Sequence, residues 1–141
     1  MNINVKKTIE EIDWCEVANL FHLVGWGERI PNELRCAFAT SSHVRFVYDN
    51  EKLIGIGRTV DDGKYYALIV DLIISPEYQG EGIGSQILKE LKDELKSFYF
   101  TTLTSATGKE DFYNKQGWKQ QKTAFIWPRS EKQRIEHAKD S

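Results

Sequence analysis

Three alternating glycines in the middle of the chain constrain its fold most. Gly80, Gly82 and Gly84 lie within residues 79–85, between a long apolar stretch and an amphipathic repeat. Glycine costs a helix roughly 1 kcal/mol relative to alanine, so three of them at a helix opening need a reason. Bare main chain lets a ligand approach free N–H groups, and the positive end of the helix dipole favours an anion. The segment is therefore either an anion-binding loop, which the density of glycines favours, or a tight strand-to-helix turn with close packing.

Two common anion-binding motifs fit this segment poorly. A P-loop requires a lysine after its last glycine, whereas Gly84 is followed directly by Ser85. The dinucleotide fingerprint G-x-G-x-x-G matches at Gly80 and Gly82 but has Ser85 in its sixth place. It also needs an acid on the next strand to hold a ribose, and residues 98–104 contain no carboxylate. A P-loop is excluded, and a dinucleotide site is poorly supported.

The pattern before the glycines predicts an antiparallel meander. Residues 44–48 recur with the period of two that is typical of a strand, and residues 53–60 predict a second strand. An Asp-Gly turn at residues 61–64 then leads into a longer strand, residues 65–74.

The pattern after the glycines predicts a helix and a parallel strand. Ile83, Ile87, Leu91 and Leu95 recur every four residues, as in an amphipathic helix of about 15 residues that packs one face on a sheet. A strand at residues 98–103 completes a right-handed crossover, so it should lie parallel to the strand before the glycines.

Shorter signals complete the predicted fold. The pairs Asp13–Glu16 and Thr107–Glu110 have the spacing of a capping box and predict two helix starts. Residues 118–127 predict one or two last strands. The fold class expected is α+β, with a central mixed, mostly antiparallel sheet, one parallel βαβ pair and about four flanking helices.

Length and composition indicate one globular domain. The chain has 141 residues, 40% of them hydrophobic and 28% charged, and its formal net charge is −2. We therefore expect a single domain with a charged tail from about residue 129. Interspersed charges argue against a nucleic-acid partner, and the longest apolar run is shorter than the about 20 residues that a membrane span needs. The first residues lack the apolar core of a secretory signal, so we expect a cytoplasmic protein.

The cysteines and histidines do not predict a metal site. Cys15 and Cys36 form no C-x-x-C pair, which excludes a zinc ribbon or a disulfide framework. Both fall in helix-like apolar patterns and are expected to be buried in a reducing compartment. His22, His43 and His137 lack the spacing of metal ligands. No bound metal is expected.

The glycine segment resembles a known loop. The pattern Q-x-x-G-x-G, from Gln79 through Gly82 to Gly84, resembles the pyrophosphate loop of the GNAT (GCN5-related) N-acetyltransferase superfamily. Residues 71–76 resemble the fourth strand of that family, and residues 112–118 resemble its F-Y-x-x-x-G-F segment. The order of elements also matches, over residues 3–128.

A narrower resemblance is to small arylalkylamine (serotonin-type) N-acetyltransferases. It is carried by Gly25-Trp26, by residues 53–58, by the strand that holds Asp71 and by the terminal residues 126–129.

The family resemblance implies acetyl-CoA as co-substrate and assigns residues to it. The main chain of Ile73 and Ile74 is implied to pair with the pantetheine arm and to supply the oxyanion donor. Asn114 and Lys115 either reach coenzyme A or form a solvated helix face. The loop residues implied to bind the cofactor are Gln79, Gly80, Glu81, Gly82, Ile83, Gly84 and Ser85.

The resemblance also implies direct attack of an amine on the thioester, and this chemistry needs a proton donor. The departing thiolate is cysteine-like, with a pKa near 8.5, so an acid beside it helps it to leave. Tyr113 is implied to be that acid. The alternative is that Tyr113 only packs in the core beside Phe112.

Asp71 is the candidate general base. It interrupts an otherwise apolar predicted strand, where an unpaired buried carboxylate would cost several kcal/mol. Burial would raise its pKa toward the range useful for a base. The alternative is a structural aspartate, held by backbone N–H groups at a bulge, that only shapes the strand.

Taken together, the sequence predicts transfer of an acetyl group from acetyl-CoA to a primary amine of a small molecule, of aralkylamine or polyamine type. The competing hypothesis is a non-catalytic acyl-CoA-binding sensor or partner-binding domain. The partner expected is the small amine, with neither nucleic acid nor membrane, and a homodimer is left open.

Overall fold

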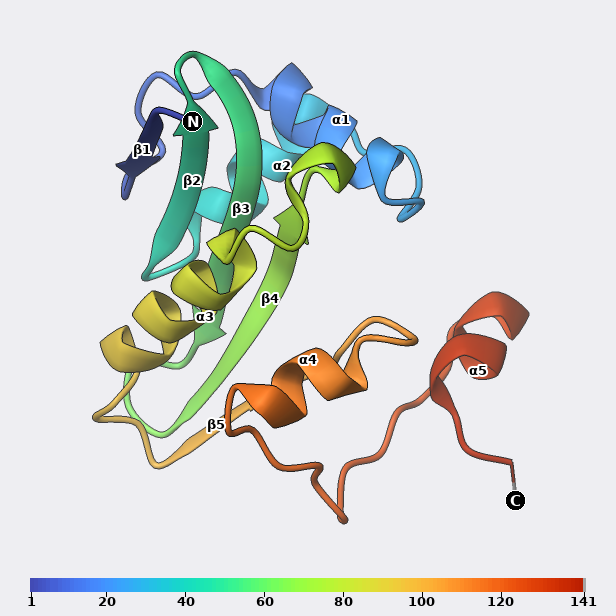
Figure 1. Ribbon diagram of the computed structural model, residues 1–141. Coiled ribbons are helices and arrows are strands. Elements are labelled where there is room, and N and C mark those ends of the chain that lie inside the picture. The colour runs from blue at the N-terminus through green and yellow to red at the C-terminus, as the bar shows by residue number, and fades with distance from the viewer. Residues whose placement is uncertain (141) are drawn as a thin grey trace. The chain divides into compact units, whose positions relative to one another are not determined.

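The computed structural model describes residues 1–140 as two compact units, Met1–Leu103 and the remainder from Thr104, and each is described by itself. The first unit holds one five-stranded sheet in the order β1-β2-β3-β4-β5. Neighbouring strands are antiparallel, except for the parallel pair β4 and β5 (Figure 1). The strands are β1 Ile3–Lys6, β2 Val44–Asp49, β3 Lys52–Asp61, β4 Tyr66–Ile74 and β5 Phe100–Leu103. The predicted meander, parallel crossover and α+β class are confirmed.

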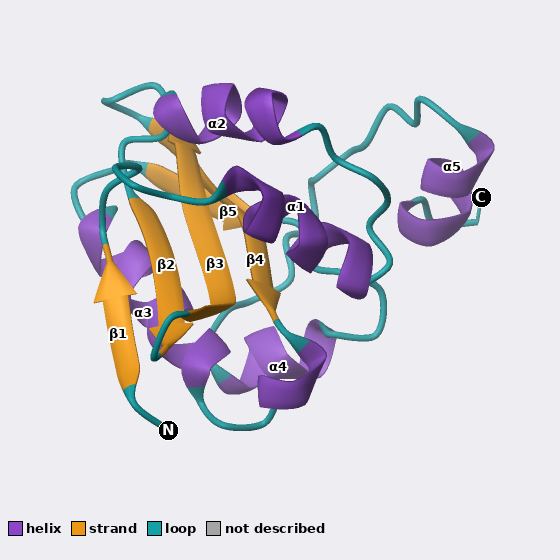
Figure 2. Cartoon of the chain, turned by 90° about the horizontal axis from the view of Figure 1, so that it is seen from above, coloured by secondary structure: helices purple, strands orange, loops and turns teal. Residues whose placement is uncertain are grey.

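Helices cover both faces of this sheet. The helices α1 (Trp14–Leu23) and α2 (Pro31–Ala39) lie on one face, and α3 (Ile83–Glu94) lies on the other (Figure 2). The core under α1 and α2 is aromatic, with Phe21, Phe38 and Phe46 each at most 1% exposed.

The start of α1 uses half of the predicted capping box. The Asp13 carboxylate accepts hydrogen bonds from the N–H groups of Cys15 at 2.9 Å and Glu16 at 3.4 Å. The Glu16 carboxylate accepts instead from the N–H of Leu53, at the start of β3, at 3.2 Å. The cap residue predicted from sequence therefore starts the helix, while its partner joins the helix to the sheet.

A glycine and an arginine fix the position of α3 on the sheet. A Cβ at Gly57 would lie 2.7 Å from Cγ2 of Ile87, so α3 packs directly on the bare main chain of β3. The buried Arg45 of β2 donates from Nε to Glu90 at 2.7 Å and from Nη2 to Glu94 at 3.2 Å. These contacts hold the helix whose first turn follows the glycine segment.

The prediction of buried cysteines is wrong, because Cys15 and Cys36 are both exposed. The buried side of α1 is formed by Val17, Leu20 and Phe21. Residues two apart on a helix point in nearly opposite directions, so Cys15 faces away from this side. Cys36 stands in the same relation to the buried residues of α2.

Two further predictions, both for residues of the second unit, are wrong, and the first concerns the last strands. The second unit contains the helices α4 (Glu110–Lys115) and α5 (Glu131–His137), and residues 118–127 form no strand. A segment forms a strand only where another strand pairs with it. Here the N–H of Trp118 instead donates to the carbonyl of Tyr113 at 3.0 Å, which turns the chain back on the end of α4.

The second predicted capping box is also wrong. Glu110 is the first residue of α4 and its N-cap residue is Lys109, so Thr107 lies too far from the helix to cap it. The Thr107 hydroxyl donates to the carbonyl of Glu136 at 3.1 Å, near the end of α5. None of the described helices combines the length and the apolar character that crossing a bilayer requires.

Candidate functional site

The last part of β4 extends beyond the end of its pairing with β5. Pairing between the two strands ends at Ile69 with Leu103, while β4 continues to Ile74. Residues 70–74 therefore have β3 as their one neighbouring strand within the described chain, and Figure 1 shows β4 extending past the short β5. Main-chain groups on the other side of this segment are available to an extended ligand.

The direction of these groups distinguishes Ile73 from Ile74. The N–H of Ser75 donates to the carbonyl of Ile54 on β3 at 2.8 Å. Main-chain groups alternate sides along a strand, so those of Ile73 also face β3 and those of Ile74 face the open side. Gln79 donates from Nε2 to the Ile74 carbonyl at 3.1 Å, consistent with that direction. Ile74 thus offers its N–H to a ligand, with its carbonyl bonded to Gln79, whereas the main chain of Ile73 faces β3 and its side chain is buried in the core.

A β-bulge lies just before this open segment. Ile56 is opposite Ile73 and Arg58 is opposite Val70, so two residues of β4, Asp71 and Leu72, lie opposite Gly57 alone. Asp71 has a φ of 54°, a left-handed conformation that few residues other than glycine adopt. Non-glycine residues in this region cost of order 1–3 kcal/mol and concentrate at functional sites.

The Asp71 carboxylate is paired with an arginine, where the structural alternative to a general base predicts backbone N–H groups. Arg58 donates from Nε to Oδ2 of Asp71 at 2.8 Å, and the two side chains are 15% and 21% exposed. The same guanidinium donates to Oγ of Ser41 at 3.2 Å and lies over the ring of Phe38, 5.2 Å from its centroid. The bulge is thereby tied to α2.

Arg58 is a site residue that the sequence pattern did not single out. The Asp-Gly turn fixes the register of β3 and β4, so a one-residue bulge brings residue 58 beside residue 71. A charged residue opposite Asp71 across a predicted hairpin was therefore the signal that could have found it.

The glycine loop is open and connects β4 to α3. The 3-10 turn η1 (Pro76–Tyr78) is followed by Gly80 and Gly82, both with a φ of 84°. A Cβ at Gly80 or Gly82 would meet nothing within 4 Å, so packing against the protein does not explain these glycines. Their positive φ does, and it leaves empty space in front of the loop.

The first turn of α3 presents free donors beside this space. Gly82 is the N-cap residue of α3, with no side-chain cap, and the first intrahelical bond runs from the N–H of Gln86 to the Gly82 carbonyl at 3.1 Å. The N–H groups of Ile83 and Gly84 therefore have no partner inside the helix. An open cradle, free N–H groups and the positive end of the helix dipole fit a diphosphate.

The remaining predicted site residues lie on α4, in the second unit. Tyr113 is half-buried, with its ring 5.0 Å from that of Phe112 and nearly perpendicular to it. Burial raises the pKa of the Tyr113 phenol above its ordinary value of 10, so this group is protonated at neutral pH. Asn114 and Lys115 are exposed.

Comparisons with known proteins agree on one family. Residues 23–127 match the family described as "Acetyltransferase (GNAT) domain". The chain is 29% identical over 115 residues to "Uncharacterized N-acetyltransferase ycf52" of Pyropia yezoensis, which covers 77% of this chain and 66% of that protein. It is 32% identical over 118 residues to "Uncharacterized N-acetyltransferase ycf52-like" of Prochlorococcus marinus, which covers 78% of this chain and 64% of that protein. The match thus spans slightly less than two thirds of the length of these curated relatives.

A solved structure gives the same result. The acetyltransferase of the GNAT family from Streptococcus pneumoniae superimposes with a TM-score of 0.76 and 32% sequence identity, covering 92% of this chain and 99% of that one. The family match includes β4, the bulge, the glycine loop and α3, and it extends over well more than half of the sequence. The chain therefore belongs to the GNAT acetyltransferase family.

Proposed function

We propose that this protein transfers an acetyl group from acetyl-CoA to a primary amine of a small molecule by direct attack. The proposal rests on one observation. The open side of β4 at Ile74, the glycine loop and the free N–H groups of α3 follow one another directly along the chain. Coenzyme A has an amide-bearing arm that suits the edge of a strand and a diphosphate that suits a helix N-terminus. The open strand edge and the helix N-terminus follow one another along the chain in the same order as the arm and the diphosphate in coenzyme A.

Acetyl-CoA supplies a thioester. Groups of this protein have to stabilise the negative charge that develops on the thioester and to transfer the protons. The open side of β4 offers the N–H of Ile74 as a donor to the developing oxyanion. Tyr113, protonated at neutral pH and with a pKa that burial raises further, is the acid that we assign to the departing thiolate.

The acceptor amine has to lose a proton. An alkyl amine with a pKa near 10.4 is neutral in only about one molecule in 2,500 at pH 7. Asp71 is the base that we assign, because it is a partly buried carboxylate at the point where β4 leaves β5. The resemblance at residues 25–26 and 53–58 supports an aralkylamine as acceptor, with a polyamine as the second choice.

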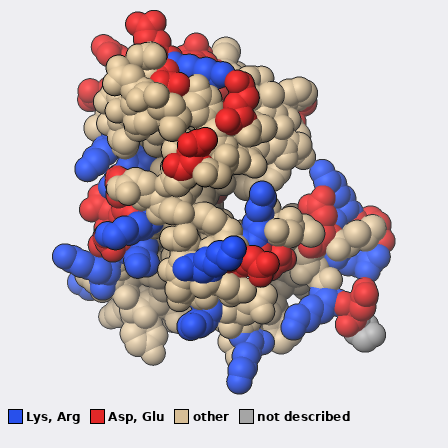
Figure 3. All heavy atoms as spheres, in the orientation of Figure 1, with Lys and Arg blue, Asp and Glu red and all other residues tan. Residues whose placement is uncertain are grey.

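Nucleic acid is not among the proposed partners. The net charge is −2, and Figure 3 shows both acidic and basic side chains on the face that it displays, with neither covering the whole face. An electrostatically held nucleic acid needs a surface dominated by positive charge.

One observation favours a second candidate function. The Asp71 carboxylate is already paired with Arg58 at 2.8 Å, and a base committed to a guanidinium is less available to an amine. A GNAT-fold module that binds acyl-CoA without turnover would keep the loop and use Asp71 only to hold the bulge.

Thiol release from acetyl-CoA across a panel of primary amines tests both candidates. Amine-dependent release, with coenzyme A binding measured in parallel by calorimetry, supports the transferase. Saturable binding of coenzyme A without release for any aralkylamine or polyamine supports the binding module. Absence of coenzyme A binding at millimolar concentrations overturns both.

A further inference from the structure

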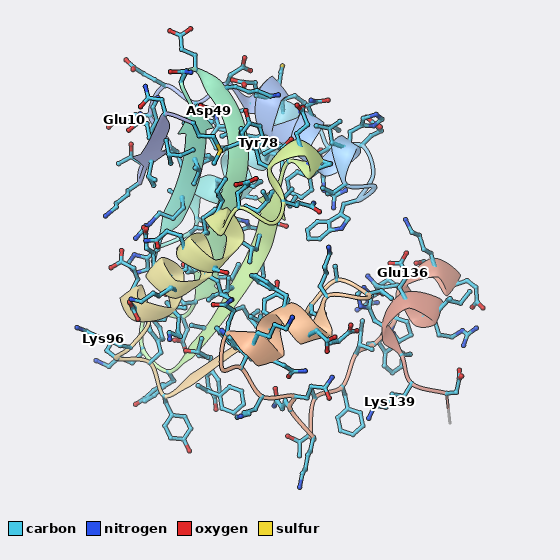
Figure 4. The ribbon with its side chains drawn as sticks, in the orientation of Figure 1. Glu10, Asp49, Tyr78, Lys96, Glu136 and Lys139 are labelled. Carbon is cyan, nitrogen blue, oxygen red and sulfur yellow. The ribbon has the colours of Figure 1, made fainter. Side chains whose placement is uncertain are left out.

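A tyrosine just before the glycine loop bonds to a distant part of the sheet. The Tyr78 hydroxyl, in η1, donates to Oδ2 of Asp49 at 2.7 Å, and Asp49 is the last residue of β2 (Figure 4). The other carboxylate oxygen of Asp49 accepts from the N–H of Asn2 at 2.9 Å. One carboxylate thus joins the start of the chain, the end of β2 and the turn that precedes the loop.

A second contact pair joins the same two turns. Lys52, the first residue of β3, lies 3.0 Å from Oε1 of Glu77, and its ammonium group lies 5.5 Å from the centre of the Tyr78 ring. Lys52 and Glu77 are 51% and 71% exposed, so this ion pair alone contributes little. The half-buried Tyr78 is the better-fixed link between η1 and the β2–β3 turn.

Besides the Gln79–Ile74 bond at the start of the loop, the glycines have no side chains that could pack against the protein. A Cβ added at Gly80 or Gly82 would have no protein atom within 4 Å, and both residues take φ values that only glycine adopts freely. A segment of this kind loses much conformational freedom when it orders around a ligand. Holding one of its ends in place beforehand lowers the entropic cost of binding.

We propose that Tyr78 and Asp49 position the glycine loop for the donor, with the Tyr78 hydroxyl bond fixing the end of η1 from which the loop departs. The inference rests on the proposed function, because it concerns the donor-binding loop of that same site. Neither residue is assigned to the reacting atoms, so both are positioning residues.

The bond is present throughout the neutral pH range. Donation from Tyr78 holds the pKa of the Asp49 carboxyl below its ordinary value, so Asp49 remains an acceptor until the pH falls well into the acid range. The same bond raises the pKa of the Tyr78 phenol above 10, so the donor proton is kept at neutral pH. Differences between variants in the binding of acetyl-CoA or coenzyme A at pH 7 therefore report the loss of this hydrogen bond, not a change in protonation.

The test compares Tyr78→Phe with the unaltered chain and with Tyr99→Phe, a control at an exposed tyrosine. Tyr78→Phe removes one oxygen, and we expect the KM for acetyl-CoA and the Kd for coenzyme A to rise roughly three- to tenfold, since one hydrogen bond is lost. With saturating donor, kcat should stay within about twofold. Tyr99→Phe should change none of these values.

A double substitution identifies the partner. If the bond to Asp49 is what matters, Asp49→Asn alone should weaken coenzyme A binding, and Tyr78→Phe/Asp49→Asn should bind about as tightly as Tyr78→Phe alone. An unchanged Kd in Tyr78→Phe, or a fall in kcat without a change in KM, overturns the inference. Because the unaltered chain is titrated first, its failure to bind coenzyme A counts against the proposed function and is recognised separately.

Discussion

Asp71 combines two features that point to different roles. Its φ of 54° at a bulge marks a strained position, as is common at functional sites, while its bond to Arg58 marks a structural ion pair. Substitution by asparagine separates the two, because asparagine tolerates the left-handed region and keeps an oxygen for Arg58.

We predict that Asp71→Asn lowers kcat about 100-fold, as expected for loss of a general base, in a chain that still folds but melts at a lower temperature because Arg58 loses its counter-charge. Steady-state rates with saturating acetyl-CoA and a thermal melt check this. A kcat within tenfold of the unaltered value would remove Asp71 from the chemistry and leave it the role of holding the bulge.

Tyr113 is predicted to act as an acid over a wide pH range. Burial raises its pKa above 10, so the phenol keeps its proton at neutral pH and loses it only in more alkaline solution. We expect Tyr113→Phe to lower kcat about 10- to 100-fold with an unchanged Kd for coenzyme A. In the unaltered chain kcat should fall above pH 10, as the phenol loses its proton. This fall should be absent in Tyr113→Phe. Equal turnover in both proteins would assign Tyr113 to packing against Phe112.

At the scale of elements, the close approach of α3 to β3 sets where the free N–H groups of the helix lie. Gly57 makes that approach possible, since a Cβ there would lie 2.7 Å from Cγ2 of Ile87 and 3.1 Å from Cδ1 of Leu91. We predict that Gly57→Ala destabilises the fold by about 1–3 kcal/mol, the usual range for overpacking.

Urea unfolding measures this cost, and Ile87→Leu provides the matched background. Leucine keeps the volume of the side chain but lacks the Cγ2 methyl that the new Cβ would meet. Gly57→Ala should therefore cost clearly less in the Ile87→Leu chain than in the unaltered one. The same cost in both backgrounds would mean that the glycine is needed for another reason.

Elements with strong local signals could be predicted from the sequence. Asp13 at the start of α1, the Asp-Gly turn between β3 and β4 and the repeat from Ile83 to Leu91 each depend on neighbours a few residues away. The strands expected at residues 118–127 failed, because a strand depends on a partner that the local pattern does not reveal.

The candidate site, like the fold, could be predicted only where its features depend on residues close in sequence. The open glycine loop follows from local residues, because positive φ at Gly80 and Gly82 is a property of the chain itself. Arg58 could be found only through the register of the predicted hairpin, since its bond to Asp71 crosses 13 residues, and the bond of Tyr78 to Asp49 crosses 29 residues and has no sequence signal. Long-range contacts of single polar side chains carry no periodic signal.

For the molecule as a whole, the proposed function depends on main-chain N–H groups of the glycine loop and of α3 binding a diphosphate. Gly82 and Gly63 offer a matched comparison, because both have positive φ, 84° and 78°, and a Cβ at either would meet nothing within 4 Å. Alanine at either position imposes a similar backbone strain, but only at Gly82 does the new methyl group enter the proposed phosphate site.

The most direct test is a calorimetric titration of the 141-residue chain and these two variants with coenzyme A. We predict saturable binding to the unaltered chain and to Gly63→Ala, and binding weaker by about tenfold or more, equivalent to at least about 1.4 kcal/mol, to Gly82→Ala. No saturation of the unaltered chain at millimolar coenzyme A, or equal affinity in Gly82→Ala, would contradict diphosphate binding by this loop.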